Sequence, residues 1–237
     1  MPKLKYKRVV LKLSGEMLRG KQWGGIEFAV ARAMVNEIKT LVNAGCEVAV
    51  VVGAGNFFRG REHRHIQVDQ VTADYMGMLG TVMNALALRT LCQIEEIPVT
   101  GLSALRVPQA IGEYTPERMN EALRDGKVVM LGGGTGNPYF STDTAVAVRA
   151  AEAKADVILK ATKVDGVYDK DPMVYKDAKK YETLTFNQAL KEKLKVMDAA
   201  AFSLCQETKI PILVFRYAKG ALLKAVQGEK IGTIVHA

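Results

Sequence analysis

Three glycine-rich segments of this sequence could bind phosphate groups. They are residues 12–15 (KLSG), 53–60 (GAGNFFRG) and 132–138 (GGGTGNP), and each follows a short apolar run that is typical of a strand. Glycine lets the backbone approach an anion closely, and the N–H groups at the start of a following helix supply positive potential. A tight turn explains any one segment, but three of them after strands favour a nucleotide site.

Charged residues near these segments could take part in phosphate chemistry. Lys12 and Arg59 would neutralise phosphate oxygens, and the alternatives are a surface lysine and a solvated loop arginine. Asp143 and Asp198 would repel phosphate unless they bind Mg²⁺ or orient a lysine; the alternatives are an acid at a helix start and a helix cap. Lys160 is a further phosphate-binding or structural lysine.

The familiar nucleotide motifs are absent. The second glycine segment lacks the third glycine of the dinucleotide fingerprint, and neither Gly-Lys pair is followed by the Ser or Thr of a P-loop. No set of protein-kinase signatures is present. His63 and His65 could suggest a metal pair or a base, but a solvated basic loop explains them better. Phosphate must therefore be bound by another scheme.

Composition narrows the class of protein. The 237 residues suit one large domain or two joined lobes, and a net charge of +8 favours anionic partners. Three scattered cysteines predict neither a disulfide framework nor a zinc site, and so favour a reducing, cytoplasmic compartment. Nothing approaches the ~18 consecutive apolar residues of a membrane span. The sequence shows no nucleic-acid-binding motif, so the charge does not predict specific binding of DNA.

The elements that must position these residues alternate along the chain. Short β-branched runs predict strands at residues 8–13, 46–52, 97–100, 127–131, 156–160, 211–216 and 232–236. Helical patterns cover residues 28–44, 68–92, 116–124, 142–153, 185–193, 198–208 and 219–226. Strands separated by helices predict an α/β fold, a three-layer αβα sandwich around a mainly parallel sheet. In such sheets ligands bind beyond the carboxyl ends of the strands.

Six longer motifs resemble one known family. LKLSGE, VVGAGNFFRG, DYMGMLGTVMNALAL, GGGTGNPYFSTDTA, LKATKVDGVYDKDP and LKVMDAAAFSL occur in the order seen in the amino-acid-kinase family, and TGNPYFSTD and KATKVDGVYDKDP resemble its UMP kinase branch. The resemblance runs from about Tyr6 to Ile234. Ala54 departs from it, because relatives often have glycine there. The implied fold is a single amino-acid-kinase domain over residues 1–237, with an acceptor lobe at 1–152 and an ATP lobe at 153–237.

The resemblance also implies a reaction. The γ-phosphoryl group of ATP is transferred reversibly to UMP, giving UDP and ADP, as a step of pyrimidine nucleotide synthesis toward CTP. Lys12, Arg59 and Mg²⁺ would neutralise the phosphates. The acceptor phosphate has a second pKa near ~6 and is largely deprotonated at neutral pH, so no strong general base is needed. Mg²⁺ would arrive with ATP, held mainly by phosphate oxygens and water rather than by a set of protein ligands.

Particular residues take roles by this resemblance. The implied catalytic residues are Lys12, Asp143, Asp198 and Lys160. The implied ATP and phosphate contacts are Lys12, Leu13, Ser14, Gly15, Gly55, Arg59, Thr162, Tyr168 and Asp171. The implied UMP contacts are Ala54, Asp74, Thr135, Gly136, Asn137, Pro138, Tyr139, Phe140, Ser141 and Thr142. Without the family, Asp74 is simply a helical acid and Asp171 belongs to a turn dipeptide.

Regulation and assembly are implied in the same way. Relatives are homohexamers that GTP activates and UTP inhibits, and the matching regulatory segment is Gly20, Lys21, Gln22, Trp23, Gly24 and Gly25. An ordinary surface turn is the alternative for that segment. The hydrophobic residues 76–88 could form a dimer face. A non-catalytic binding protein with the same fold is the alternative function, but such a protein could lose Lys12, Asp143 or Asp198, and all three are present.

Overall fold

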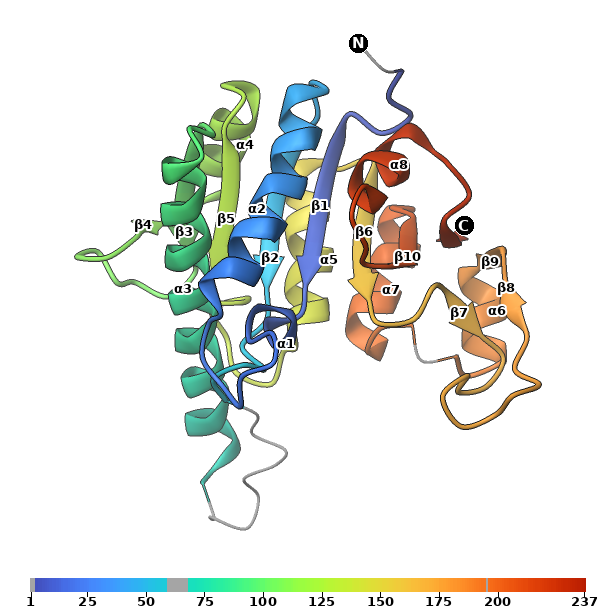
Figure 1. The fold of residues 1–237 in the computed structure, drawn as a ribbon. Helices are drawn as coiled ribbons and strands as arrows, with labels where there is room; N and C mark the ends of the chain where they lie inside the picture. Colours follow the sequence, from blue (N-terminus) through green and yellow to red (C-terminus); the bar gives the residue numbers. More distant parts are fainter. Residues whose placement is uncertain (1–2, 59–67, 195) are drawn as a thin grey trace.

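A single mixed sheet forms the centre of the molecule (Figure 1). The computed structural model describes residues 3–58, 68–194 and 196–237, and within them nine strands pair in the order β4-β3-β5-β2-β1-β6-β10-β11-β9. The strands are β1 (Arg8–Leu13), β2 (Glu47–Val52), β3 (Val99–Ser103), β4 (Gly112–Glu113), β5 (Val128–Gly132), β6 (Val157–Thr162), β9 (Thr183–Thr185), β10 (Ile212–Arg216) and β11 (Gly232–His236). The strands from β4 to β10 in this order run parallel to one another. Strand β11 is antiparallel to β10, and β9 pairs with β11 in the parallel sense.

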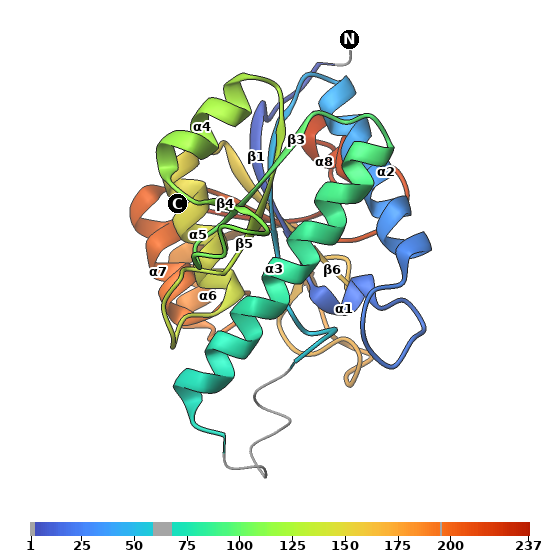
Figure 2. The ribbon, with the colours of Figure 1, turned by 90° about the vertical axis from the view of Figure 1, so that its left-hand side faces the viewer.

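Helices cover both faces of the sheet, so the molecule has three layers (Figure 2). One face carries α1 (Gly15–Leu18), α2 (Phe28–Asn43), α3 (Gln70–Ile94) and α8 (Ala221–Gln227). The other face carries α4 (Pro116–Arg124), α5 (Thr142–Ala153), α6 (Phe186–Lys191) and α7 (Ala199–Thr208). A separate antiparallel hairpin, β7 (Val167–Tyr168) with β8 (Lys180–Tyr181), follows β6. The predicted three-layer α/β sandwich is confirmed.

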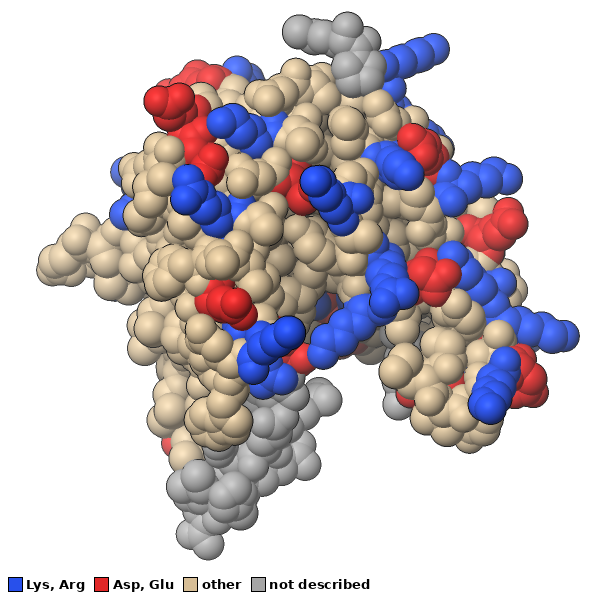
Figure 3. Space-filling view, in the orientation of Figure 1, with Lys and Arg blue, Asp and Glu red and all other residues tan. Residues whose placement is uncertain are grey.

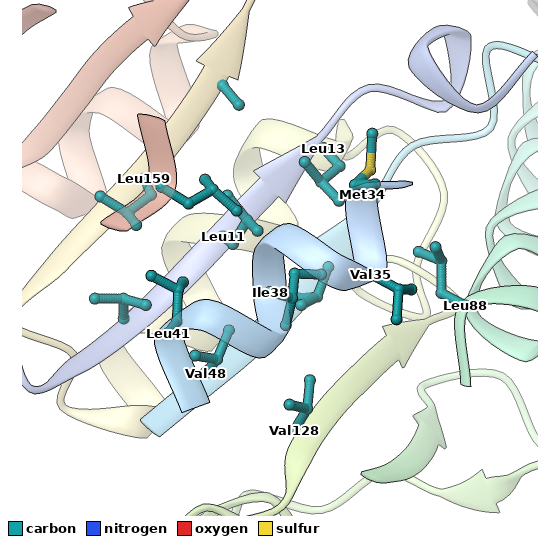
Figure 4. Close-up of a cluster of buried hydrophobic side chains, with 14 of the residues drawn as sticks. Leu11, Leu13, Met34, Val35, Ile38, Leu41, Val48, Leu88, Val128 and Leu159 are labelled. Carbon is teal, nitrogen blue, oxygen red and sulfur yellow. The ribbon is translucent and has the colours of Figure 1, made fainter. Parts of the chain in front are cut away.

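Two hydrophobic cores, one on each face, hold the layers together. On the first face α2 buries residues three to four positions apart, Met34, Ile38 and Leu41, against Leu11 and Val48 of the central strands (Figure 4). This spacing is the stripe that an amphipathic helix presents to a sheet. The central strands are buried on both faces, as expected for parallel strands covered by helices.

Most predicted elements lie where the sequence placed them, and the exceptions have local causes. The predicted strand at 97–100 begins later, at Val99, because Glu96 adopts a positive φ of 57° and the Ile97 N–H donates to the Cys92 carbonyl, which closes the end of α3. The elements α1, β4, β7, β8 and β9 were not predicted. Each has two to four residues, which is too short for a periodic pattern.

All three cysteines are free and buried, and burial raises the pKa of each thiol to about 12. Within the described residues, no helix combines the length and the apolar character that crossing a membrane requires.

The sheet is continuous where β1 pairs with β6, across the predicted lobe boundary. The division into an acceptor lobe and an ATP lobe stays a prediction.

Candidate active site

Two of the glycine segments touch each other at the carboxyl ends of β1 and β2. The Gly53 N–H donates to the Leu13 carbonyl at 3.0 Å. A Cβ atom at Gly15 would lie 2.4 Å from the Gly53 carbonyl oxygen and 2.7 Å from the Gly55 nitrogen, so a side chain at position 15 would collide with backbone. A Cβ at Gly53 would lie 3.5 Å from Oγ1 of Thr142, the first residue of α5. Backbone N–H groups and a helix start therefore converge here.

Two lysines on neighbouring strands share one carboxylate beside these segments. Lys12 of β1 and Lys160 of β6 are register partners, so their side chains leave the sheet on the same face. Asp143, in the first turn of α5, places Oδ1 3.3 Å from Lys12 Nζ and Oδ2 2.7 Å from Lys160 Nζ. The three side chains are 17%, 13% and 19% exposed for Lys12, Lys160 and Asp143. The structure thus brings three of the predicted catalytic residues into one cluster.

Burial controls the protonation of Lys160. Desolvation lowers its pKa below the ordinary value, and the positive charge of Lys12 lowers it further, while Asp143 acts in the opposite direction. Lys160 Nζ also donates to the Val196 carbonyl at 2.5 Å. A nearby phosphate would favour the charged form of this lysine. The cluster can therefore strengthen its positive charge when an anion binds.

Asp198, the fourth predicted catalytic residue, contacts the start of α5 instead of a lysine. It is the N-cap of α7, where it accepts the Ala201 N–H at 3.0 Å, and it also accepts hydrogen bonds from Thr144 Oγ1 (3.0 Å) and Ser141 Oγ. Burial alone would raise its pKa, but these hydrogen bonds outweigh burial and the pKa is lowered. Asp198 is therefore a carboxylate that fixes the N-terminus of α5. For Asp198, these contacts favour the helix-cap alternative over the orientation of a lysine.

The third glycine segment leads from β5 toward α5 and is buried at Gly132 and Gly133, partly buried at most later positions and exposed at Asn137. Gly133, Gly134 and Gly136 have φ angles of +76°, +57° and +83°, which favour glycine. Tyr139 is also left-handed, with φ of 70°, and its N–H donates to Oδ2 of Asp74 on α3 at 2.7 Å. The predicted uridine contacts from Thr135 to Thr142 all lie on this loop or at its junction with α5, and Asp74 lies beside it.

Two residues that sequence reasoning missed anchor this loop. Thr81 of α3 accepts the Gly133 N–H through Oγ1 at 2.8 Å. Arg149 of α5 donates to the Gly134 carbonyl at 3.0 Å, pairs with Glu152 at 2.8 Å, and is only 5% exposed. Its guanidinium group stacks on the Tyr114 ring, 3.7 Å from the centroid. The sequence does contain a signal for Arg149: it is the one charged residue in the otherwise small and apolar stretch AVAVRAA, which indicates a buried arginine with specific partners.

The predicted donor residues line a cavity of about 450 Å³ beyond β6. Thr162, Tyr168 and Asp171 all contribute to its wall, and Lys160 connects it to the lysine cluster. Tyr168 donates its hydroxyl hydrogen to Asp165 at 2.6 Å, and this hydrogen bond raises the pKa of the phenol. The volume suits a nucleoside. The structure therefore brings together residues that are far apart in the sequence, next to the proposed phosphate site.

The remaining predicted residues are those of the regulatory segment and those that lie outside the described residues. In the Gly20–Gly25 segment, Trp23 is 98% exposed, while Gly25 bonds to Asn56 in the second glycine segment. Arg59, His63 and His65 lie outside the described residues, so the position of the predicted acceptor-phosphate arginine stays a prediction.

Charge over the surface is mixed. Figure 3 shows basic and acidic side chains interspersed on this face, and a notch at its lower edge beside the β7–β8 hairpin. A mixed surface of this kind differs from the continuous basic stripe that tracks a nucleic-acid backbone.

Comparisons with known proteins agree with this geometry. Residues 7–216 match the model of the Amino acid kinase family. The uridylate kinase of Legionella pneumophila (strain Corby) is 47% identical over 237 residues, which cover 100% of this chain and 96% of that protein.

Solved structures with the same fold are similar over nearly the whole chain. The UMP kinase of Bacillus anthracis has a TM-score of 0.95 and 35% identity, covering 98% of this chain and 96% of that chain. The UMP kinase of Ureaplasma parvum has a TM-score of 0.93 and 35% identity, covering 99% of this chain and 100% of that chain.

Proposed function

This chain belongs to the amino acid kinase family, and from that premise we infer that it transfers the γ-phosphoryl group of ATP to UMP, giving UDP and ADP. The observation that carries this function is the 47% identity to a uridylate kinase across the entire chain. The Lys12–Asp143–Lys160 cluster, which lies between the donor cavity and the loop from Thr135 to Thr142, supports it.

Phosphoryl transfer between two nucleotides is chiefly a problem of charge and alignment. The UMP phosphate has a second pKa near ~6, so it is already an adequate nucleophile at neutral pH and no strong base is required. Lys12 and Lys160 neutralise the phosphates that meet between the two sites, and Asp143 holds both ammonium groups in place. Arg59 adds positive charge on the acceptor side.

Backbone groups complete the phosphate site. Ser14, Gly15 and Gly55 follow strands β1 and β2, and the Gly55 nitrogen lies 2.7 Å from the position that a Cβ at Gly15 would take, so the two glycines would approach the same phosphate. Their positions are fixed before substrate arrives, so little reorganisation accompanies the reaction. Thr142 and the start of α5 extend the same surface toward the acceptor.

Mg²⁺ would enter with ATP, and when bound it neutralises charge on the nucleotide phosphates. One atom of this chain fits that ion: Oδ1 of Asp143 is buried, and apart from the ion pair with Lys12 it has no hydrogen-bond partner in the described structure. A carboxylate oxygen of this kind suits a hard cation or one of its water ligands. Most of the ligands would come from phosphate oxygens and water.

The nucleosides are bound on opposite sides of this cluster. Asp74 accepts hydrogen bonds from the ribose of UMP, and Asn137 with neighbouring threonines reads the uracil edge. Tyr168 lies against adenine in the cavity beyond β6, and Asp171 accepts from the ribose of ATP. The support is the position of each residue: the donor set shares one cavity, and Asp74 contacts the loop that carries the acceptor set.

Assembly is part of the proposal. Helix α3 exposes Tyr75, Met76, Leu79 and Met83, which are 41–52% exposed and recur at helical spacing. An exposed apolar stripe of this kind marks a protein interface. It would form the dimer contact of a homohexamer, activated by GTP and inhibited by UTP. Light scattering on the protein and on a Leu79→Glu variant tests this, since an unchanged mass for the variant would exclude the stripe as an interface.

A coupled assay tests the reaction. Purified protein with ATP, Mg²⁺ and UMP should form UDP at a much higher kcat/KM than with CMP or AMP. Lys12→Ala should reduce turnover strongly while the protein stays folded. Activity on carbamate or acetylglutamate with none on UMP would refute the function, and full activity of Lys12→Ala would refute the role of that lysine.

A further inference from the structure

Two buried asparagines form a pair behind the phosphate site. Asn84 of α3 is 0% exposed and Asn56 of the second glycine segment is 4% exposed. Their amides bond reciprocally: Asn56 Nδ2 donates to Asn84 Oδ1 at 2.9 Å, and Asn84 Nδ2 donates to Asn56 Oδ1 at 2.8 Å. A buried amide is costly unless its donors and acceptors are paired, so this geometry is strongly preferred over alternatives.

Each amide also holds a backbone carbonyl. Asn84 Nδ2 donates to the Gly53 carbonyl at 2.8 Å, and Asn56 Nδ2 donates to the Gly25 carbonyl at 2.9 Å. The Gly25 N–H returns a bond to the Asn56 carbonyl at 2.9 Å. The pair therefore links α3 to the second glycine segment through buried hydrogen bonds, and the second glycine segment to the segment around Gly25 through a partly buried one.

The Gly53 peptide is the part of this network that reaches the reaction. The Gly53 N–H donates to the Leu13 carbonyl and the Gly53 carbonyl accepts from Asn84, so each of the two peptide groups that meet at Gly53 is held by a hydrogen bond. The same carbonyl lies against Gly15, and Gly53 faces Thr142 at the start of α5. A shift of this peptide would move the backbone that is proposed to contact both phosphates.

We propose that Asn84 and Asn56 are positioning residues for phosphoryl transfer, which fix the Gly53 peptide and couple its position to that of the Gly25 segment. The proposal rests on the function proposed above. Neither asparagine needs to touch a nucleotide. Their effect is on the alignment of the phosphates, so it should appear in kcat more than in the affinity for the nucleoside, which is bound by the loop from Thr135 to Thr142.

The first test replaces the amide by an apolar group of similar shape. Asn84→Leu leaves the Gly53 carbonyl and Asn56 without a donor, and kcat should fall at least tenfold while the Kd for UMP, measured by calorimetry, changes less than threefold. Asn120→Leu is the matched control, because Asn120 also ties two backbone carbonyls (Pro116 at 2.8 Å and Glu152 at 3.0 Å) but lies between α4 and α5, away from the glycine segments. The control should lose stability and keep kcat.

The second test moves the Gly25 end of the network. Gly25 has φ of +80° with nothing within 4 Å of a Cβ, and Gly45 has φ of +83° with the same open space. Alanine at either position meets the same backbone strain and no clash, so both variants should lose a similar amount in Tm. Only Gly25→Ala should lower kcat, by about tenfold, because only Gly25 is bonded to Asn56.

The outcomes separate the proposal from the function. Wild-type protein that forms no UDP would refute the function; amide hydrogen exchange at Gly53 and Gly25 then still tests the network, since Asn84→Leu should speed exchange at both positions and Asn120→Leu at neither. Active wild type with normal kcat in Asn84→Leu or Gly25→Ala would overturn the proposal. Equal losses of kcat in the variants and their controls would also overturn it, since stability alone would then explain the effect.

Discussion

Removing the carboxylate of Asp143 should impair both stability and activity, and the structure gives the scale of each loss. Asp143→Asn keeps the size of the side chain but removes the carboxylate that pairs with both Lys12 and Lys160, so the two ammonium groups lose their shared ion-pair partner. Removing one partner of a buried ion pair costs about 3–5 kcal/mol, and an exposed pair contributes ~0–1 kcal/mol. Since the three side chains are 13–19% exposed, we expect a loss of about 3 kcal/mol in the free energy of unfolding.

The effect on activity follows from the charge of Lys160. Asp143 is the main group that opposes the lowering of its pKa, so the variant should hold a larger neutral fraction of this lysine, and both ammonium groups lose their fixed positions. We expect kcat/KM for UMP to fall about a hundredfold, which corresponds to ~2.7 kcal/mol of transition-state stabilisation.

Denaturation and steady-state kinetics measure the two losses. For a chain of this length the loss of stability corresponds to a decrease of about 6–12 °C in Tm. Glu47→Gln is the matched control, since Glu47 pairs with Arg8 at the opposite end of β1, with side chains 32% and 22% exposed. The control should lower Tm and leave kcat/KM unchanged. An Asp143→Asn protein that is folded at the assay temperature and retains full kcat/KM would refute this account of the lysine cluster.

Three other changes should give distinct results. Arg149→Met frees the Gly134 carbonyl and should raise KM for UMP about tenfold with a smaller change in KM for ATP; equal changes in both would contradict its role in the acceptor loop. Tyr168→Phe keeps the ring but removes the hydrogen bond to Asp165, so KM for ATP should change less than threefold, whereas Tyr168→Ala should raise it strongly if the ring contacts adenine. Raising the pH should lower kcat/KM, which reports the free enzyme, on an alkaline limb that begins below the usual lysine range, because the pKa of Lys160 is lowered. The stability contribution of Lys160 should change in the opposite direction: between its folded and unfolded pKa values the native state binds fewer protons, so the free energy of unfolding rises with pH. Comparison of wild type with Lys160→Met over that pH range checks the sign.

The sequence was sufficient to predict the fold because its signals are long and regular. The strand at Arg8–Leu13 and the helices at Thr142–Ala153 and Pro116–Arg124 have periodic patterns or caps, and the predicted bounds are confirmed. Thr115 and Pro116 are residue types that favour a helix start, and the structure has Thr115 accepting the Arg118 N–H as the N-cap of α4, with Pro116 as the first helical residue. Glycine segments after parallel strands necessarily come to one edge of the sheet.

What the sequence could not predict is how distant side chains pair. Nothing in the pattern around residue 84 distinguishes a buried asparagine from an exposed one, and its partner is 28 positions away. The pairing of Lys12 with Lys160 depends on strand register, which is set by the whole sheet. Asp198 directly precedes α7, so the sequence can predict its role as a helix cap. Its second contact, with Thr144 of α5, depends on how the two helices pack and could not be predicted from the sequence.

On the function proposed for this chain, the affinity of the site for phosphate depends on the arrangement of the cluster and not on the net charge of +8. Among the described residues of the cluster, Lys12 and Lys160 are balanced by Asp143 and Asp198, so local formal charge is close to zero before substrate binds. Attraction must then depend on arrangement: Asp143 holds the ammonium groups against one side of the site, and the glycine segments present backbone N–H groups on another. Long-range attraction by the surface charge is screened by salt over about 10 Å, whereas partly buried contacts of this kind are screened much less. Increasing the ionic strength from low to physiological values should therefore reduce the rate of nucleotide association while leaving kcat nearly unchanged, and a proportional fall in kcat would show that the surface charge, rather than the cluster, stabilises the transferred phosphoryl group.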